Sequence, residues 1–97
     1  MNITWTLEAR GDMRGIRAFI GRNSQLQALK QIERIRLRVR WISDMPMRGH
    51  PVHEFPESGC VEVHEGKYRI IHRIEGEDLN IVTVIHMRQM LDLDRLR

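Results

Sequence analysis

Two periods of apolar residues follow one another along the chain, and each predicts a different kind of element. Ile3, Trp5 and Leu7 alternate with polar residues, which predicts a short N-terminal strand. From residue 7 to about residue 22, apolar side chains recur every three or four positions, as they do in an amphipathic helix. The first part of the chain therefore predicts a strand followed directly by a helix.

A second helical period runs from Leu26 to about Asp44. Asn23 or Ser24 stands just before it, and either side chain can cap the first turn of a helix. Because the link between the two helices is short, we expect them to pack as an antiparallel hairpin.

The second half of the chain changes to the alternation that is typical of β-strands. Residues 45–58 contain all three prolines, which predicts a loop. Three strands are predicted after it, at residues 61–64, 68–74 and 79–86. The last of them is apolar on both faces, as a central strand would be. Residues 89–97 predict a short helix or tail.

These elements predict one α+β domain over residues 1–97. In it, a short N-terminal strand and an antiparallel helix hairpin pack on a three- to four-stranded antiparallel sheet. The composition, 41% apolar and 30% charged, is that of a globular protein. No apolar run reaches the roughly 20 residues of a membrane span, and the N-terminus lacks the charged-then-apolar order of a signal peptide. We therefore expect a soluble, cytoplasmic protein, in which the single cysteine, Cys60, is buried and forms no internal disulfide.

Positive charge is concentrated on the second helix. The net charge is +3, and the basic residues are 14 arginines and 2 lysines. Between residues 22 and 48 there are seven positive and two negative side chains, a local charge of +5. Arginine binds carboxylates and phosphates with a planar fork, so the pattern fits an acidic protein or a nucleic acid. GC-rich coding explains the arginine bias equally well, and the simpler interpretation of the basic helix is a solvated face.

The turns set the pairing of the predicted strands. A two-residue turn at Glu65-Gly66 places Glu62 directly opposite Arg69. A turn centred on Gly76-Glu77 places His86 diagonal to Arg69, roughly 7–8 Å away. The face expected to pack on the helices carries Val61, Val63, Tyr68, Ile70, His72, Ile74, Leu79, Ile81, Thr83 and Ile85. The other, polar face carries Glu62, His64, Lys67, Arg69, Ile71, Arg73, Asn80, Val82, Val84 and His86.

The polar face predicts a phosphate-handling site. Arg69 would hold a phosphate, and His86 or Glu62 would act as general acid or base, with Arg88 as a second anion contact beyond the strand end. The side chains expected to contact an anion or a target are His64, Lys67, Arg69, Arg73 and Arg88. The alternative is a cross-strand ion pair on an exposed sheet face, worth less than about 1 kcal/mol.

The remaining histidines predict no metal site. His50 and His53 lie in the proline loop, and no cysteine pair or carboxylate completes a known ligand spacing with them. His72 falls on the core face, which predicts a buried histidine with its polar atoms satisfied. Nucleotide-binding glycine motifs and nucleophile signatures are absent from the sequence, so we expect no cofactor.

The order of strand, helix hairpin, proline loop and three-stranded meander resembles the RelE/ParE superfamily of toxin–antitoxin toxins. The stretches that carry the resemblance are Trp5–Ala9, Met45–Gly49, Gly66–Ile74 and Val84–Arg88. The third of these, a Gly-x-Tyr-Arg-Ile-Ile-x-x-Ile strand, is the most diagnostic together with the Val-Ile-His-x-Arg stretch that follows. The resemblance covers essentially the whole chain.

The resemblance implies a growth-inhibiting toxin that a cognate antitoxin neutralises by wrapping an acidic, partly disordered segment around it in a hetero-oligomeric complex. ParE-like members inhibit DNA gyrase, whereas RelE-like members cleave mRNA on the ribosome. In the RelE-like branch, Arg69 falls on a phosphate-stabilising position, His86 or Arg88 near the C-terminal catalytic positions, and Glu62 on the base of a related subgroup. The chain has few lysines and no aromatic residue after Tyr68 to stack a base. The long hairpin and the His-x-Arg ending resemble the ParE side.

Three functions follow in order of preference. The first is a ParE-like gyrase inhibitor without enzymatic activity, and the second is a RelE-like ribosome-dependent mRNA endonuclease. The third is a small basic nucleic-acid-binding module outside toxin–antitoxin biology.

Overall fold

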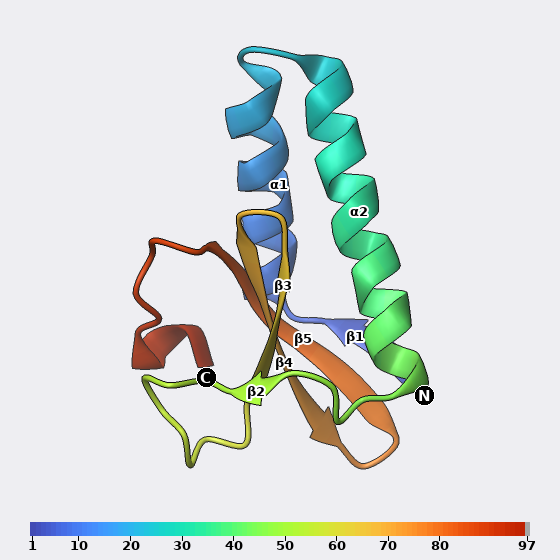
Figure 1. Ribbon diagram of the computed structural model, residues 1–97, viewed down its shortest axis with the longest axis vertical. Helices are drawn as coiled ribbons and strands as arrows, with labels where there is room; N and C mark the ends of the chain where they lie inside the picture. Colours follow the sequence, from blue (N-terminus) through green and yellow to red (C-terminus); the bar gives the residue numbers. More distant parts are fainter. Residues whose placement is uncertain (97) are drawn as a thin grey trace.

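A five-stranded sheet lies beside a hairpin of two long helices in the computed structural model, which describes residues 1–96 (Figure 1). The elements are β1 (Asn2–Trp5), α1 (Leu7–Gly21), α2 (Gln25–Asp44), β2 (His50–Pro51), β3 (Val61–Glu65), β4 (Tyr68–Glu75), β5 (Asp78–His86) and the 3-10 helix η1 (Leu93–Leu96). The fold is α+β, as predicted, and the helices and the three long strands lie within two residues of their predicted bounds.

Both helices begin at capping side chains. The Ser24 hydroxyl accepts a hydrogen bond from the amide of Gln27 at 3.1 Å, which decides between the two predicted caps of α2. Thr6 caps α1 in the same way through the amide of Ala9, at 3.0 Å. Its hydroxyl also donates to the carbonyl of Val82 at 2.7 Å. The start of α1 is therefore fixed to the middle of β5.

The sheet has more strands than the sequence predicted and is mixed. The strand order is β1-β5-β4-β3-β2. The strand β1 pairs with β5 in the parallel direction, and all other pairs are antiparallel. The two-residue β2 extends the other edge, within the predicted loop. Side-chain alternation assigns faces but not partners, so the parallel pairing of β1 could not be read from its four residues.

The first hairpin turns one residue later than predicted. Gly66 and Lys67 form the loop, and Gly66 has φ of +59°, which suits the first position of a two-residue hairpin turn. Arg69 therefore pairs with His64, not with Glu62, which pairs with Ile71. The shift moves each pairing by two positions in total, so the side chains of β3 and β4 keep their predicted faces.

The second hairpin contains a β-bulge that the sequence did not predict. Pairing follows the prediction from the turn as far as His72 and Ile81, and then slips so that Ile71 pairs with Thr83. The extra residue reverses the faces of the rest of β5. Thr83 and Ile85 leave the predicted core face, whereas Val84 and His86 turn toward the helices. The predicted proximity of His86 and Arg69 is therefore wrong.

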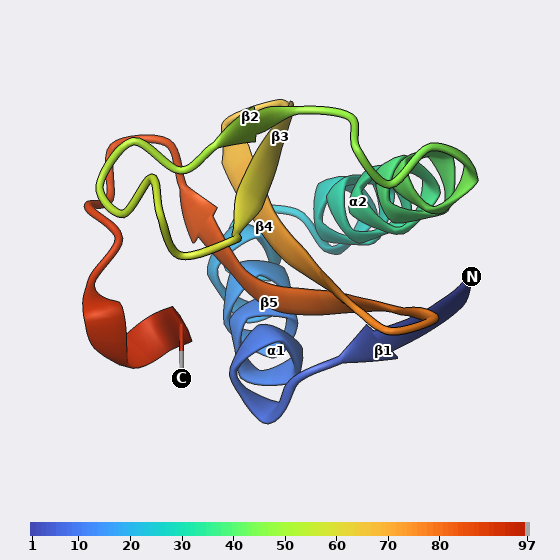
Figure 2. The ribbon, with the colours of Figure 1, turned by 90° about the horizontal axis from the view of Figure 1, so that it is seen from below.

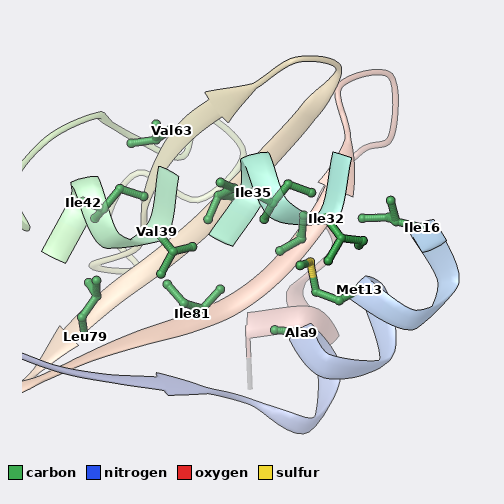
Figure 3. Close-up of a cluster of buried hydrophobic side chains, with 12 residues drawn as sticks. Ala9, Met13, Ile16, Ile32, Ile35, Val39, Ile42, Val63, Leu79 and Ile81 are labelled. Carbon is green, nitrogen blue, oxygen red and sulfur yellow. The ribbon is translucent and has the colours of Figure 1, made fainter. Parts of the chain in front are cut away.

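Two apolar cores cover the two faces of the sheet. The larger lies between the sheet and the helices and includes Met13, Ile35, Val39, Ile42, Ile70, Leu79 and Ile81 (Figure 3). The second lies on the opposite face and consists of Val52, Cys60, Ile71, Val82, Ile85, Leu91 and Leu96, with Phe55 against it. The loop after β2 and the C-terminal segment lie on this side, away from α2 (Figure 2). The face predicted to be polar and exposed is thus covered, and it forms one side of the second core. Cys60 is buried there, as predicted.

His72 is fully buried on the helix side of the sheet. Neither ring nitrogen makes a hydrogen bond of regular geometry within residues 1–96, although the backbone of Pro46 and Ile70 lies near the ring, so the prediction of a satisfied histidine holds for its burial only. Burial lowers the pKa of the imidazole below its ordinary value of 6.5, against a smaller raising effect of the backbone at Pro46 and Ile70.

We expect acid to destabilise the protein through His72 before it affects the carboxylates. Below pH 6.5 the unfolded chain binds a proton that the folded chain does not, so the free energy of unfolding falls as the pH falls toward the lowered folded-state pKa. His72→Leu should flatten this dependence between about pH 7 and pH 5. Denaturant unfolding at several pH values measures it, and equal slopes for the two proteins would show that His72 is not responsible.

Candidate functional site

The Arg69 side chain is the centre of a buried ion cluster on the second face of the sheet. Its Nε and Nη2 donate to the two oxygens of Glu62, at 2.8 and 3.0 Å. Its Nη2 and Nη1 donate to the two oxygens of Glu54, at 2.8 and 2.9 Å, and Nη1 also donates to the carbonyl of Gln89 at 3.1 Å. A guanidinium has five N–H donors, and each of them has an acceptor here. Arg69 is 4% exposed.

The cluster links four separate segments of the chain. Arg69 comes from β4 and Glu62 from β3, whereas Glu54 comes from the loop after β2 and Gln89 from the segment after β5. Glu54 also accepts from the backbone amide of Leu91 at 2.9 Å. The ion cluster therefore fastens the loop and the C-terminal segment onto the sheet.

Hydrogen bonding keeps both carboxylates of the cluster ionised. Bonds from Arg69 lower the pKa of Glu54 from 4.5 to about 2, although burial opposes them. For Glu62, burial raises the pKa, but bonds from Arg69 and His64 together outweigh it, so its pKa also lies below 4.5. The same bonds to Glu54 and Glu62 raise the pKa of Arg69. One cation between two anions leaves the cluster with a net charge of −1.

Two exposed histidines adjoin this negative cluster. His64 Nε2 lies 2.9 Å from Glu62 Oε2, and His53 Nδ1 lies 3.2 Å from Glu54 Oε1. His50 joins them around a cavity of about 310 Å³ above Arg69. His53, Glu54 and Glu62 bring their ligand atoms within 4.8 Å of one another. A cation would have to compete with the guanidinium for oxygens that Arg69 already holds, so the arrangement favours the ion pair over a metal.

The remaining predicted site residues lie apart from Arg69. His86 is on the helix side, where its ring meets Tyr68 edge-on at 5.7 Å between centroids. Its Nδ1 accepts from the amide of Arg88 at 3.1 Å. Lys67 and Arg88 are exposed beyond the ends of the strands. Arg73 binds Glu75 through a hydrogen bond of 2.8 Å. The structure therefore brings together Glu62, His64 and Arg69 but not the rest of the predicted patch.

A groove runs between the two helices on the other side of the molecule. Its volume is about 620 Å³. Apolar side chains from β1 and both helices line it together with arginines. The lining residues are Trp5, Met13, Leu29, Ile32, Arg10, Arg14, Arg17, Arg36 and Glu33. Four arginines against one glutamate make this groove a strongly cationic site that apolar side chains also line.

The match to a known family extends over most of the chain rather than over one motif. The family model described as ParE toxin of the type II toxin–antitoxin system parDE matches residues 3–91. The chain belongs to the ParE toxin family. None of the curated protein sequences compared with this ParE toxin matches it.

Two solved structures resemble this ParE toxin. One, titled as the chromosomal ParDE system from P. aeruginosa, has a TM-score of 0.75 and 19% identity, covering 89% of this chain and 95% of the other. The second, the toxin–antitoxin complex RelBE2 from Mycobacterium tuberculosis, has a TM-score of 0.60 and 25% identity, covering 88% of each chain. The first supports the fold, and the second extends the likeness to the wider RelE/ParE superfamily predicted from the sequence.

A second polar cluster in this ParE toxin was not foreseen from the sequence. Asp12 of α1 accepts from the Thr83 hydroxyl at 2.5 Å and from the Val84 amide at 2.9 Å, next to the bulge. Arg95 of η1 donates to Asp12 at 2.9 Å and to Thr83 at 3.2 Å. The carboxylate thus satisfies the backbone N–H of Val84 and ties α1 to β5. No sequence signal joins these residues, because the bulge that exposes their partners is itself unpredicted.

Neither helix of this ParE toxin, within residues 1–96, combines the length and apolar character that crossing a bilayer requires.

Proposed function

We propose that this ParE toxin acts in the cytoplasm by binding DNA gyrase and inhibiting it, without chemistry of its own, and that an acidic antitoxin neutralises it. The toxin class follows from the family, whereas the target and the neutralisation are our proposals. The choice of target rests on one observation, that the Arg69 guanidinium is buried and fully hydrogen-bonded inside the protein.

A ribonuclease of this fold would need Arg69 to hold a phosphate. Every N–H of its guanidinium is already bonded inside the protein, and the group is nearly inaccessible. A phosphate would have to break these bonds and strand a buried carboxylate, which costs several kcal/mol. His86, the proposed acid or base, is on the opposite face of the sheet. These facts favour a structural role for Arg69 and Glu62, and leave His64, Lys67, Arg73 and Arg88 as candidate contacts to a target or anion.

The cationic groove offers a place for the antitoxin. The apolar side chains that line it, Met13, Leu29 and Ile32, suit the apolar side of an amphipathic helix, and the arginines that line it suit acidic side chains on the same helix. A disordered acidic segment that folds on binding can fill such a groove and extend over the neighbouring surface. We therefore expect a gene for a small acidic protein beside the gene of this toxin.

The test is a pair of assays on the purified protein. We expect it to inhibit supercoiling of relaxed plasmid by DNA gyrase and to leave ribosome-bound mRNA intact. Addition of the acidic protein from the neighbouring gene should restore supercoiling, which serves as the specificity control. Cleavage of ribosome-bound mRNA without gyrase inhibition would overturn the proposal in favour of the endonuclease. Activity in neither assay would overturn both.

A further inference from the structure

We infer that this toxin contacts its target protein through a patch centred on Trp41, near the end of α2 and outside the cationic groove. The inference rests on the proposed function, because the target protein is gyrase only if that proposal holds. The Trp41 patch consists of Leu37, Arg38, Trp41, Met45, Met47 and Arg48. None of these residues lines the groove proposed for the antitoxin.

Trp41 is held in place by two arginines and remains open to solvent. The guanidinium of Arg48 lies 4.0 Å from the ring centroid and that of Arg38 lies 5.0 Å from it. Arg48 also donates to the carbonyl of Trp41 at 2.7 Å and to the sulfur of Met45 at 3.1 Å. The tryptophan is nevertheless 41% exposed. Its conformation is therefore fixed before binding, which lowers the entropy cost of an interface.

The composition of the patch is that of an interface centre. Tryptophan, methionine and arginine are the residues enriched at protein–protein interfaces, and tryptophan and arginine dominate their energetic centres. Leu37 precedes Trp41 by one helical turn, on the same side of α2. Met47 is 78% exposed in the loop that follows the helix. Large apolar side chains with so much exposed surface gain most from being covered.

The charge around Trp41 selects an acidic protein as the partner. Between residues 37 and 48 there are three arginines and one aspartate, and Glu65 partly offsets them by pairing with Arg38 at 3.5 Å, which leaves a net positive charge. A second copy of this chain would meet the patch with like charge, which disfavours self-association. Nucleic-acid binders instead leave aromatic faces open for stacking on bases, whereas the Trp41 ring carries guanidinium groups. A phosphate backbone would also offer no apolar surface to cover the exposed leucine and methionines.

The test compares variants of the patch with a matched pair elsewhere. Trp41→Ala and Met47→Glu should each raise the concentration for half-inhibition of gyrase supercoiling by about tenfold or more. Met47 is so exposed that its substitution should leave folding intact, as thermal unfolding would check. The control is Phe19→Ala. Phe19 lies in the last turn of α1, where it is exposed and its ring lies 5.7 Å from the guanidinium of Arg22. This substitution should change the inhibition by less than about twofold.

The outcomes separate this inference from the proposed function. Folded patch variants that lose inhibition but still bind the antitoxin support the inference. Unchanged inhibition by both patch variants overturns it, while the activity of the unaltered toxin still upholds the proposed function. Loss of plasmid binding by the toxin alone, in parallel with loss of inhibition, overturns it in favour of a nucleic-acid surface. An unaltered toxin that does not inhibit gyrase overturns the proposed function and the inference with it.

Discussion

Arg69→Met is expected to lower the free energy of unfolding by about 3–5 kcal/mol. The substitution removes five hydrogen bonds and leaves the carboxylates of Glu54 and Glu62 buried side by side without a cation. Their repulsion and lost solvation, rather than the missing methylene contacts, make up most of the loss. Urea unfolding followed by circular dichroism measures it.

Two comparisons test this account of Arg69. Adding Glu54→Gln and Glu62→Gln to Arg69→Met should recover part of the lost stability, because the uncompensated charge disappears with them. The single variant should also be less impaired as the pH falls toward 4.5, the ordinary pKa of these carboxyl groups, where protonation relieves the repulsion. An Arg69→Met protein as stable at neutral pH as the unaltered chain would contradict the role of the cluster.

Gly49→Ala is expected to lower the free energy of unfolding by at least about 3 kcal/mol. Gly49 precedes β2 with φ of +103°, a conformation that side chains rarely adopt. A Cβ atom there would lie 2.3 Å from the carbonyl oxygen of Glu62 and 2.9 Å from a methyl group of Val63. Because the nearest obstacle is backbone, β2 would have to separate from β3.

Gly76→Ala is the matched control for this strain. Gly76 also has positive φ, at +61°, but no atom lies within 4 Å of the added methyl group. The conformational penalty alone should cost about 1 kcal/mol. Chemical denaturation of both variants separates the two contributions. Equal losses at Gly49 and Gly76 would show that the close approach to Glu62 is tolerated and that only φ matters.

The local elements were predictable because their signals lie within a few residues of one another. Spacing of apolar positions located α1 and α2, and the pair Asn23 and Ser24 marked the start of the second helix. The first turn was placed one residue early, yet the faces of β3 and β4 survived because both strands moved together. Each of these predictions depends on period and turn chemistry, which are local properties.

The site was less predictable because it depends on long-range events. The strand β5 is apolar on both faces, so no break in alternation announces the bulge near Val82 that turns His86 away. Glu54 and Asp12 belong to a loop and a helix whose partners are distant in sequence. A polar residue expected on an exposed sheet face, Arg69, became buried because the loop and the C-terminal segment cover that face. Only the folded chain shows that this face is covered.

The parallel pairing of β1 with β5 has a consequence for how the toxin is made. The hydrogen bond from Thr6 to Val82 spans 76 positions, and β5 is the one strand that pairs with β1 among the described residues 1–96. During translation the helices can form early, but β1 must wait for β5, the last strand within residues 1–96, before its edge is paired. The sheet therefore stays incomplete at its β1 edge until β5 has been made, although both helices and two of the long strands precede β5 in the chain.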